Sequence, residues 1–274
     1  MTPTLGAEIA TGRTSDIFEW VPGQIIKVLK PTAPSGTIEK EVHDSVTAYA
    51  LGITPIRCYG EVVLDDGRRG VAFDRVTGDA LTTVAEKRPY LIPAVGRILA
   101  REHAAIHATH SSDFRDIRDV ATDLLDTGPL APLSETDRAA LRRYLQSLPG
   151  GDSVLHLDFH PLNVFEHNDA TATIDWQSTA SGHPAADVAA TCLLFTEAEL
   201  FPGISAFQKV LYQSVRRIML GFYLREYRRI TGMDSAATEQ WMTAARILRL
   251  GWLNVDSERD HLLTLIRAGA RGEH

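Results

Sequence analysis

Three side chains between residues 158 and 175 have the types and spacing that phosphoryl transfer requires. Asp158 is followed five residues later by Asn163, and Asp175 ends a short apolar run further on. In phosphoryl transfer, one carboxylate orients the attacking hydroxyl and takes its proton, while an amide oxygen and a second carboxylate hold magnesium on the phosphates of ATP. We therefore expect Asp158 to be the catalytic base and Asn163 and Asp175 to be the metal ligands.

Three further polar residues are expected to support the loop that carries the base. His156 and His160 lie on either side of Asp158, where they would fix the loop through hydrogen bonds. Asp187 opens a helical apolar run, a position that favours an acid. From there it could accept hydrogen bonds from the backbone of the catalytic loop.

The same residues allow a second interpretation, a metal-dependent hydrolase. On a strand, His156, Asp158 and His160 would share one face and could bind a metal ion together. Pro161 favours a loop instead of a continuing strand, and no further convincing set of ligands is present. A histidine series at helical spacing lacks the His-Glu-x-x-His pattern and is expected to make interior hydrogen bonds: His103, His107 and His110.

A lysine among apolar neighbours is the expected anchor of the nucleotide phosphates. Lys27 lies in the middle of the run 25–29, where a solvated lysine would be out of character. It could reach the α- and β-phosphates while pairing with an acid on the next helix, Glu41 first and Glu39 second. An edge-strand lysine facing water is the alternative, because Lys30 shows that the segment tolerates lysine.

The loop expected to cover the phosphates lies in segment 10–17. Its single glycine, Gly12, would let backbone amides approach phosphate, and the hydroxyl of Thr14 or Ser15 could add contacts. A kinase loop of this kind commonly has three glycines, so the match is poorer than that of the other motifs.

Hydrophobic periodicity divides the chain into two parts. The first part predicts one helix over 37–51 and short strands at 5–10, 15–20, 24–30, 57–64 and 70–75. From about Leu81 the periodicity becomes helical over long stretches. We predict an α+β, bilobal protein kinase-like fold with a small β-rich nucleotide-binding lobe, 1–76, and a larger helical lobe, 77–274, with the catalytic loop and acceptor site.

Composition and charge narrow the class of protein further. A hydrophobic content of 44% and a charged content of 23% are ordinary for a globular protein. The net charge of -7 argues against a nucleic-acid partner, which would require a basic face. Cys58 and Cys192 are far apart and are expected to be buried free thiols. With no signal-peptide pattern and no run long enough to span a bilayer, we expect a cytoplasmic protein without a membrane partner.

These motifs together resemble the aminoglycoside phosphotransferase and choline kinase-like superfamily. The resemblance rests on His156-x-Asp158-x-His160-Pro161-x-Asn163, Ile174-Asp175-Trp176, Gly182-x-Pro184-x-x-Asp187 and the Lys27 strand. It implies ATP with Mg²⁺ and phosphorylation of a small-molecule hydroxyl, on an aminoglycoside-like antibiotic or an amino-alcohol or sugar metabolite. The resemblance also implies that Asp158 is the base, that Asn163 and Asp175 are the metal ligands, and that Lys27 and Glu41 anchor the phosphates. It further implies that the backbone groups of Asp74 and Val76 contact the adenine.

Leu157 departs from the pattern of the superfamily. Such proteins usually have glycine before the catalytic aspartate, and leucine is expected to crowd the loop without removing a reacting group.

The resemblance does not imply which acceptor is phosphorylated. Several acids of the second part could meet a cationic acceptor: Glu197, Glu199, Glu226 and Asp256. A nucleotide-binding module without catalysis is the remaining alternative. The single-glycine loop favours this alternative, whereas the presence of the expected base, the two expected metal ligands and the lysine counts against it.

Overall fold

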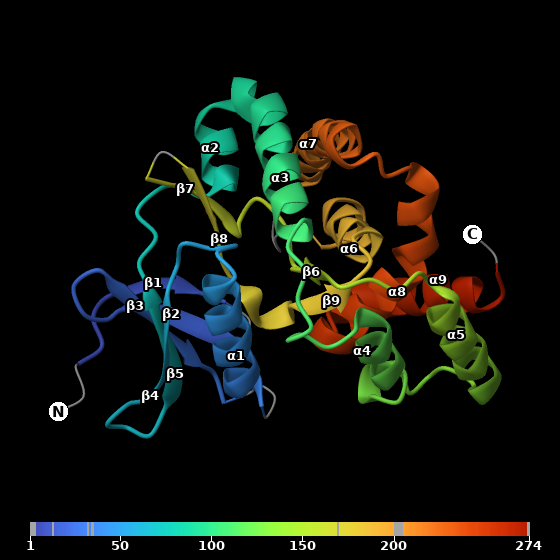
Figure 1. Ribbon diagram of the computed structural model, residues 1–274, viewed down its shortest axis with the longest axis horizontal. Helices are drawn as coiled ribbons and strands as arrows, with labels where there is room; N and C mark the ends of the chain where they lie inside the picture. Colours follow the sequence, from blue (N-terminus) through green and yellow to red (C-terminus); the bar gives the residue numbers. More distant parts are fainter. Residues whose placement is uncertain are drawn as a thin grey trace. The chain divides into compact units, whose positions relative to one another are not determined.

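The computed structural model describes residues 4–12, 14–31, 33, 36–168, 170–199 and 205–272. A five-stranded antiparallel sheet comes first in the chain and a mainly helical part follows (Figure 1), which confirms the predicted α+β class. The chain groups into two compact units, residues 1–83 with 161–179 and residues 84–160 with 180–274. A functional boundary after residue 76 stays a prediction.

The sheet of the first unit consists of short strands joined by turns that the sequence marks. In spatial order the strands are β1 (Glu8–Thr11), β2 (Ser15–Glu19), β3 (Gln24–Leu29), β5 (Arg69–Asp74) and β4 (Cys58–Val63). Gly23 and Gly67 have φ of 81° and 84°, the left-handed conformation that glycine adopts at little cost in a turn. β1 begins three residues later than the sequence predicts, and β3 is the central strand.

One helix and one hairpin complete the first unit. Helix α1 (Thr37–Ala50) lies against β4 and β5, and its Ile38 packs with Cys58 and Val71. The hairpin consists of β7 (Val164–His167) and β8 (Ala170–Thr173), and the short helix η3 (Trp176–Ser178) follows it and contacts α1. Segment 161–179 therefore belongs to the first unit although it comes late in the chain.

The second unit is built from helices around one short antiparallel strand pair. The pair is β6 (Ser153–Leu155) with β9 (Ala180–Gly182). The helices are α2 (Leu81–Lys87, which begins in the first unit), η1 (Pro89–Leu91), α3 (Ile92–His107), α4 (Ile117–Leu124), η2 (Gly128–Leu130), α5 (Glu135–Ser147), α6 (Ala185–Thr196), α7 (Ala206–Thr231), α8 (Ser235–Leu253) and α9 (Asp256–Ala270).

Side-chain caps fix several of these helix ends. Ser205 accepts a hydrogen bond from the amide of Gln208, and the Gln208 side chain accepts one from the Ser205 amide, which is a capping box at the start of α7. The same helix ends at Gly232, whose φ of 73° suits a glycine. Asp234 caps α8 in the same way as Ser205 caps α7, because its carboxylate accepts from the amide of Ala237.

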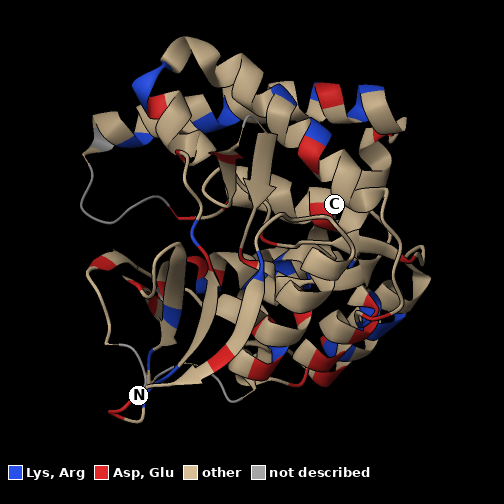
Figure 2. Ribbon diagram, turned by 60° about the vertical axis from the view of Figure 1, so that its left-hand side comes forward, with Lys and Arg blue, Asp and Glu red and all other residues tan. Residues whose placement is uncertain are grey.

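Charged side chains of both signs are interspersed along the helices (Figure 2). Many form exposed pairs, such as Arg115 with Asp123 and Arg142 with Asp126, each at 2.6 Å. An exposed pair of this kind contributes only about 0–1 kcal/mol to stability, because water screens both charges. These exposed pairs therefore add little to what holds the fold together.

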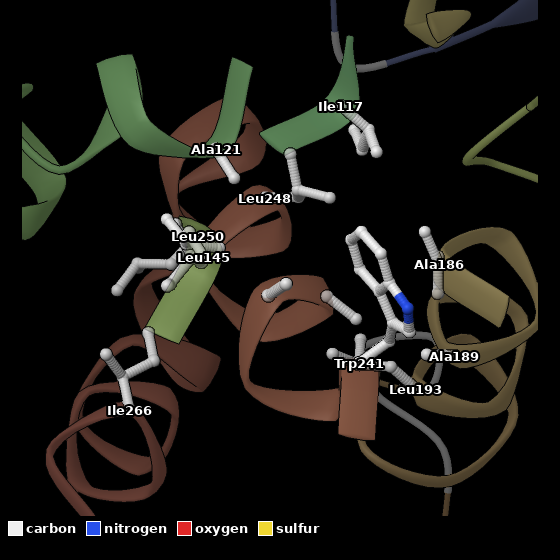
Figure 3. Close-up of a cluster of buried hydrophobic side chains, with 14 of the residues drawn as sticks. Ile117, Ala121, Leu145, Ala186, Ala189, Leu193, Trp241, Leu248, Leu250 and Ile266 are labelled. Atoms are coloured by element: carbon white, nitrogen blue, oxygen red, sulfur yellow. The ribbon is translucent and has the colours of Figure 1, made fainter. Parts of the chain in front are cut away.

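The main hydrophobic core lies in the second unit (Figure 3). Trp241 of α8 is 1% exposed and packs among Ala186, Ala189 and Leu193 of α6. The small alanines let α6 and α8 approach closely, and each fully buried leucine contributes about 1.5–3 kcal/mol through the hydrophobic effect. Over the described ranges, no helix combines the length and the apolar character needed to cross a membrane.

Candidate active site

In the first unit, Lys27 lies between two carboxylates. Its Nζ is 2.7 Å from Glu41 Oε1 and 2.9 Å from Asp175 Oδ1. Because β3 is flanked by β2 and β5, the edge-strand interpretation of Lys27 is wrong. Glu41 is the helix acid that pairs with Lys27, whereas Glu39 is exposed and pairs with Arg69 at 2.8 Å.

Electrostatics keep Lys27 charged in this position. Burial alone would lower the pKa of Lys27, but the negative charges of Asp175 and Glu41 outweigh it and raise that pKa above its ordinary value. The side chain of Glu41 is 2% exposed, so the pair is nearly withdrawn from water. A fixed cation beside a carboxylate that is itself 27% exposed is an arrangement that can bind a phosphate chain.

The β7–β8 hairpin brings the two expected metal ligands to neighbouring positions. Val164 pairs with Thr173, and just beyond that pair the carbonyl of Asn163 accepts a hydrogen bond from the amide of Ile174 at 2.9 Å. Asp175 follows with φ of 67°, a left-handed conformation that aspartate tolerates better than most residues. Among the described residues, Asp175 Oδ2 has no hydrogen-bond partner, because Lys27 contacts Oδ1 only.

The expected phosphate loop is held at its base by a lysine. The amide of Gly12 donates to the carbonyl of Ser15 at 2.8 Å, and the Gly12 carbonyl accepts from Lys30 Nζ at 2.6 Å. Lys30 also lies 3.2 Å from Asp16 Oδ1. Gly12 is exposed and Ser15 is buried at the start of β2, so their contacts with ATP stay predictions.

The two residues expected to meet adenine lie at the end of β5. The side chain of Asp74 accepts hydrogen bonds from the amide of Arg57 at 3.0 Å and from the hydroxyl of Tyr59 at 2.8 Å. Val76 is partly buried two residues later. These contacts fix the chain direction at this point, and the role of both backbones in nucleotide binding stays a prediction.

In the second unit, Asp158 lies in the loop after β6 between its two histidines. His160 Nε2 is 3.5 Å from Asp158 Oδ1, and the Asp158 amide donates to His156 Nδ1 at 3.3 Å. Burial raises the pKa of Asp158, but the positive character of His160, His156 and Arg249 outweighs it and lowers the pKa. Asp158 is therefore a carboxylate at neutral pH, as a catalytic base must be.

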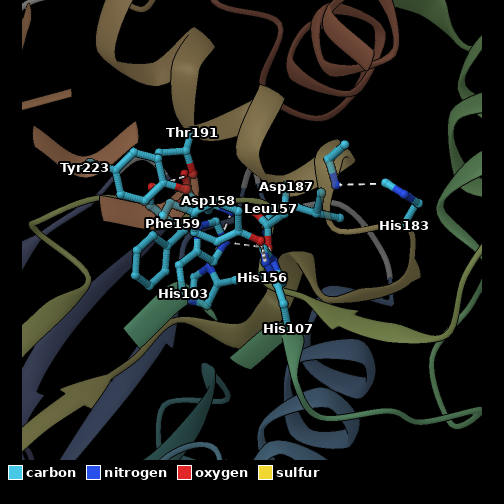
Figure 4. Close-up of polar contacts among 12 residues, drawn as sticks. His103, His107, His156, Leu157, Asp158, Phe159, His183, Asp187, Thr191 and Tyr223 are labelled. Carbon is cyan, nitrogen blue, oxygen red and sulfur yellow. Dashed lines mark hydrogen bonds and ion pairs between the residues drawn. The ribbon is translucent and has the colours of Figure 1, made fainter. Parts of the chain in front are cut away.

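A buried carboxylate holds the backbone of this loop (Figure 4). Asp187, in the first turn of α6, is 0% exposed, and its Oδ1 accepts from the Leu157 amide at 2.9 Å. Its Oδ2 accepts from the His156 amide and lies 3.0 Å from His103 Nε2 and 3.2 Å from His107 Nε2. The expected interaction between Asp187 and the catalytic loop backbone is thus present.

Two tyrosines of α7 complete this buried network. Tyr223 donates to His103 Nδ1 at 2.7 Å, and Tyr227 donates to His107 Nδ1 at 2.6 Å. Since the Asp187 carboxylate can only accept, each histidine presents its Nε2–H to Asp187 and its Nδ1 to a tyrosine. Burial lowers the pKa of His103 to about 4, although Asp187 opposes this, so His103 is neutral.

Sequence reasoning singled out both histidines but missed both tyrosines. Tyr223 and Tyr227 are four residues apart, the same spacing as His103 and His107, and α3 packs along α7. Equal spacing of hydrogen-bonding residues on two long helices is the signal that could have paired them. His110, the third member of the histidine series, lies outside the network and pairs with exposed Asp152 at 2.8 Å.

Leu157 affects the loop through its backbone. Its φ of 63° is the left-handed conformation, which costs a leucine about 1–2 kcal/mol. Its side chain is 6% exposed within the main hydrophobic core, so its burial offsets the strain. A glycine would adopt this φ without penalty, so the substitution introduces backbone strain, and crowding of the loop stays a prediction.

The metal-dependent hydrolase interpretation gains no support from the structure. Over the described residues, the one group of three acid, cysteine or histidine side chains close enough to share an ion is His103, His107 and Asp187, within 4.8 Å of one another. Hydrogen bonds already engage both oxygens of Asp187, the Nδ1 of each histidine and His107 Nε2, while His103 Nε2 lies 3.0 Å from Asp187 Oδ2. The alternating set His156, Asp158 and His160 is not such a group.

The sequence is similar to one family of known proteins. Residues 27–217 match the family model described as a phosphotransferase enzyme family. No curated protein matches the chain.

Solved structures of aminoglycoside phosphotransferases share the fold. The chain is similar to a thermostable mutant of aminoglycoside phosphotransferase APH(4)-Ia in its apo form, with a TM-score of 0.65 and 16% identity over 98% of this chain and 93% of that chain. The ternary complex of such a mutant with AMP-PNP and hygromycin B gives 0.66 and 15% identity, over 98% and 92%. An aminoglycoside-3'-phosphotransferase of type VIII gives 0.60 and 17% identity, over 92% and 94%.

At these identities the solved structures show the fold, whereas the family match shows descent and reaction class. That match covers more than half of the chain, from the lysine of β3 to the middle of α7. The protein therefore belongs to the phosphotransferase enzyme family and is an enzyme that acts on small molecules.

Proposed function

We propose that the protein transfers the γ-phosphate of ATP to a hydroxyl group of a small molecule, with magnesium as cofactor. The observation that carries the proposal is Lys27, held at 2.7 Å from Glu41 and 2.9 Å from Asp175. One cation thereby connects a buried acid to a carboxylate with an oxygen left over for a metal. A related enzyme of the same fold has been solved with AMP-PNP and hygromycin B, a nucleotide analogue and a small acceptor.

The residues of the first unit fit a magnesium ion. The amide oxygen of Asn163 and the carboxylate of Asp175 are oxygen ligands of the kind that magnesium prefers. When bound, magnesium would screen the negative charge of the β- and γ-phosphates. Lys27 would bind the phosphates, and Glu41 would hold the Lys27 side chain in place.

Asp158 would act on the acceptor. The hydroxyl oxygen of the acceptor forms a bond to the γ-phosphorus, and the bond from that phosphorus to the β–γ bridging oxygen breaks. Asp158 accepts the proton of the hydroxyl, so the products are ADP and a phosphate ester. Its lowered pKa keeps it ionised and ready to accept, and the bonds from Asp187 to the loop backbone fix its position.

The test is ADP release from magnesium-ATP in the presence of candidate acceptors: aminoglycosides, amino-alcohols and sugars. Asp158→Asn should lower acceptor-dependent turnover by about 10²–10⁴-fold, the usual contribution of a positioned base, while nucleotide binding is retained. Asp260→Asn, an exposed acid of the same unit, is the matched control and should leave turnover unchanged. Turnover in Asp158→Asn close to that of the control would contradict the proposal.

A further inference from the structure

The segment that carries Asp175, residues 173–179, lies against α1 in the first unit (Figure 1). Asp175 has a φ of 67°, a conformation that persists only where the surrounding contacts fix it. At the start of the segment, the carbonyl of Thr173 accepts a hydrogen bond at 2.7 Å from the hydroxyl of Thr54, which follows α1 in the chain. Further along, Lys27 holds the carboxylate of Asp175. These contacts come from residues that lie close to α1 or are paired with it.

A second lysine contacts the end of this segment. The Nζ of Lys40, on α1, donates a hydrogen bond to the carbonyl of Thr179 at 3.1 Å. The same Nζ is paired with the carboxylate of Asp44, one turn further along α1. Thr179 is 4% exposed, and its amide donates to the carbonyl of Trp176 at 3.0 Å, which closes the turn of η3. Lys40 therefore connects α1 to the carboxyl end of η3.

Asp44 is a buried carboxylate for which the proposed reaction gives no role. Its side chain is 5% exposed, and it lies on the same face of α1 as Glu41, three residues earlier. His43 Nδ1 lies 3.0 Å from Asp44 Oδ1, whereas Lys40 is paired with Oδ2. Removing a carboxylate from water is costly unless a cation compensates its charge, so Asp44 and Lys40 hold each other in place.

The two acid–lysine pairs follow one pattern, in which a buried acid of α1 holds a cation that contacts segment 173–179. The lysine paired with Glu41 contacts Asp175 itself, and the lysine paired with Asp44 contacts Thr179. Asp175 and Thr179 are the two ends of η3, which is a single short turn. A displacement of Thr179 would therefore also displace the Asp175 carboxylate. Its Oδ2, which has no hydrogen-bond partner in the described part of the chain, is the oxygen left for a metal ion.

We propose that Lys40, held by Asp44, is a positioning residue for the magnesium site, because it fixes η3 and thereby the carboxylate of Asp175. Lys40 would contact neither the nucleotide nor the metal ion and would act through the backbone of Thr179. Loss of a group that orients a metal ligand from outside the site typically lowers metal affinity by about 10- to 100-fold. Lys40 acts through one hydrogen bond and is 45% exposed, so we expect the lower end of this range. The inference rests on the phosphotransferase function proposed above.

The first test measures the binding of AMP-PNP by calorimetry, with and without magnesium. In Lys40→Met, the Kd with magnesium should rise about 10-fold, whereas the Kd without magnesium should be unchanged. Lys40→Arg can donate to the same carbonyl and should restore most of the affinity. His43→Gln changes another partner of Asp44 and leaves the bond to Thr179, so it is the matched control and should bind as wild type. An equal loss with and without magnesium, or no loss in either condition, would overturn the proposal.

A double variant separates positioning from the cost of a buried charge. Lys40→Met leaves the Asp44 carboxylate without its lysine, which should lower the stability of the fold. In Lys40→Met/Asp44→Asn this charge is absent, so the double variant should unfold at a higher urea concentration than Lys40→Met. Its magnesium-dependent binding should nevertheless stay weakened, because the contact with Thr179 is not restored. Wild-type binding in the double variant would show that Lys40 only compensates Asp44, and it would overturn the proposal.

Hydrogen exchange provides a readout that requires no nucleotide. The amides of Ile174 and Thr179 donate to backbone carbonyls at 2.9 and 3.0 Å, so both should exchange slowly in wild type. In the free protein, exchange across residues 174–179 should be faster in Lys40→Met than in His43→Gln. Equal exchange in the two variants would overturn the inference. If wild type does not bind magnesium-AMP-PNP, the proposed function fails, yet exchange still decides whether Lys40 fixes η3.

Discussion

Single residues in the expected reacting segments adopt unusual backbone conformations. Leu157 must direct its amide to Asp187 Oδ1, 2.9 Å away, and it does so with a φ of 63°. Asp175, the expected metal ligand, has a φ of 67°. Residues held in sparsely populated conformations tend to gather at functional sites, where the surrounding contacts fix them. Both expected reacting segments of this chain therefore contain a residue in a strained conformation.

Substitution at Leu157 can separate this strain from the loss of packing. Leu157→Ala and Leu157→Gly both remove a buried side chain, which costs about 2–5 kcal/mol. Only glycine also relieves the left-handed backbone, so Leu157→Gly should be more stable than Leu157→Ala by about 1 kcal/mol. Urea unfolding of the two variants measures this difference. The usual order, with alanine the more stable, would show that residue 157 does not adopt this conformation in solution.

At the scale of elements, α3, α6 and α7 surround one buried polar network. Asp187 on α6 contacts His103 on α3 at 3.0 Å, and Tyr223 on α7 contacts the other nitrogen of that histidine at 2.7 Å. Phe159 stacks on the His103 ring, with 4.0 Å between ring centroids. These contacts hold the three helices on the catalytic loop. Protonation of the buried groups in the network would cost free energy.

This network predicts a specific loss of stability in acid. The pKa of His103 is lowered to about 4 from 6.5, so between these values the unfolded chain binds more protons than the folded protein. The contribution of His103 is therefore fully present above pH 6.5 and declines as the pH falls to 4, by about 3 kcal/mol. Asp187, whose pKa is well below its ordinary value, remains ionised throughout.

The measurement is the free energy of unfolding in urea at several pH values from 7 to 4. His103→Gln cannot gain a proton at this position, so its stability should decline with a shallower slope than that of wild type over this interval. Parallel curves for the two proteins would mean that His103 is already protonated, or that it titrates equally in both states.

Local patterns in the sequence predicted the helices and strands better than they predicted which residues contact one another. The strands around Lys27 and the helix over 37–51 follow from periodicity and turn residues, which act within a few positions. Pairing of Lys27 with Glu41 followed from the chemistry of phosphate binding. The role of Tyr223 did not, because its contact with His103 spans 120 positions, and the only signal is the equal spacing of the two pairs on distant helices.

At the scale of the whole molecule, the chain passes between its two units three times, near residues 83, 160 and 179. A single boundary between two parts of the sequence cannot describe these units, because segment 161–179 belongs to the first unit although it follows residues of the second. The return places Asp175 beside Lys27, 148 positions earlier in the chain. The expected base, Asp158, belongs to the other unit.

Nucleotide binding can be tested in the intact protein through its stability, because a ligand that binds only the folded state stabilises it. At 100 times its Kd, magnesium-AMP-PNP should add about 2.7 kcal/mol, which for a chain of this size is a rise in melting temperature of roughly 5–10 °C. Lys27→Met removes the cation between Glu41 and Asp175, so this rise should be lost at the same concentration. Lys209→Met, at an exposed position on α7, should retain it.

Because removal of Lys27 also leaves two carboxylates without their counter-charge, the Lys27→Met variant should melt lower than wild type even without nucleotide. An unchanged rise in Lys27→Met would mean that the phosphates bind elsewhere, and it would remove the observation on which the proposed function depends.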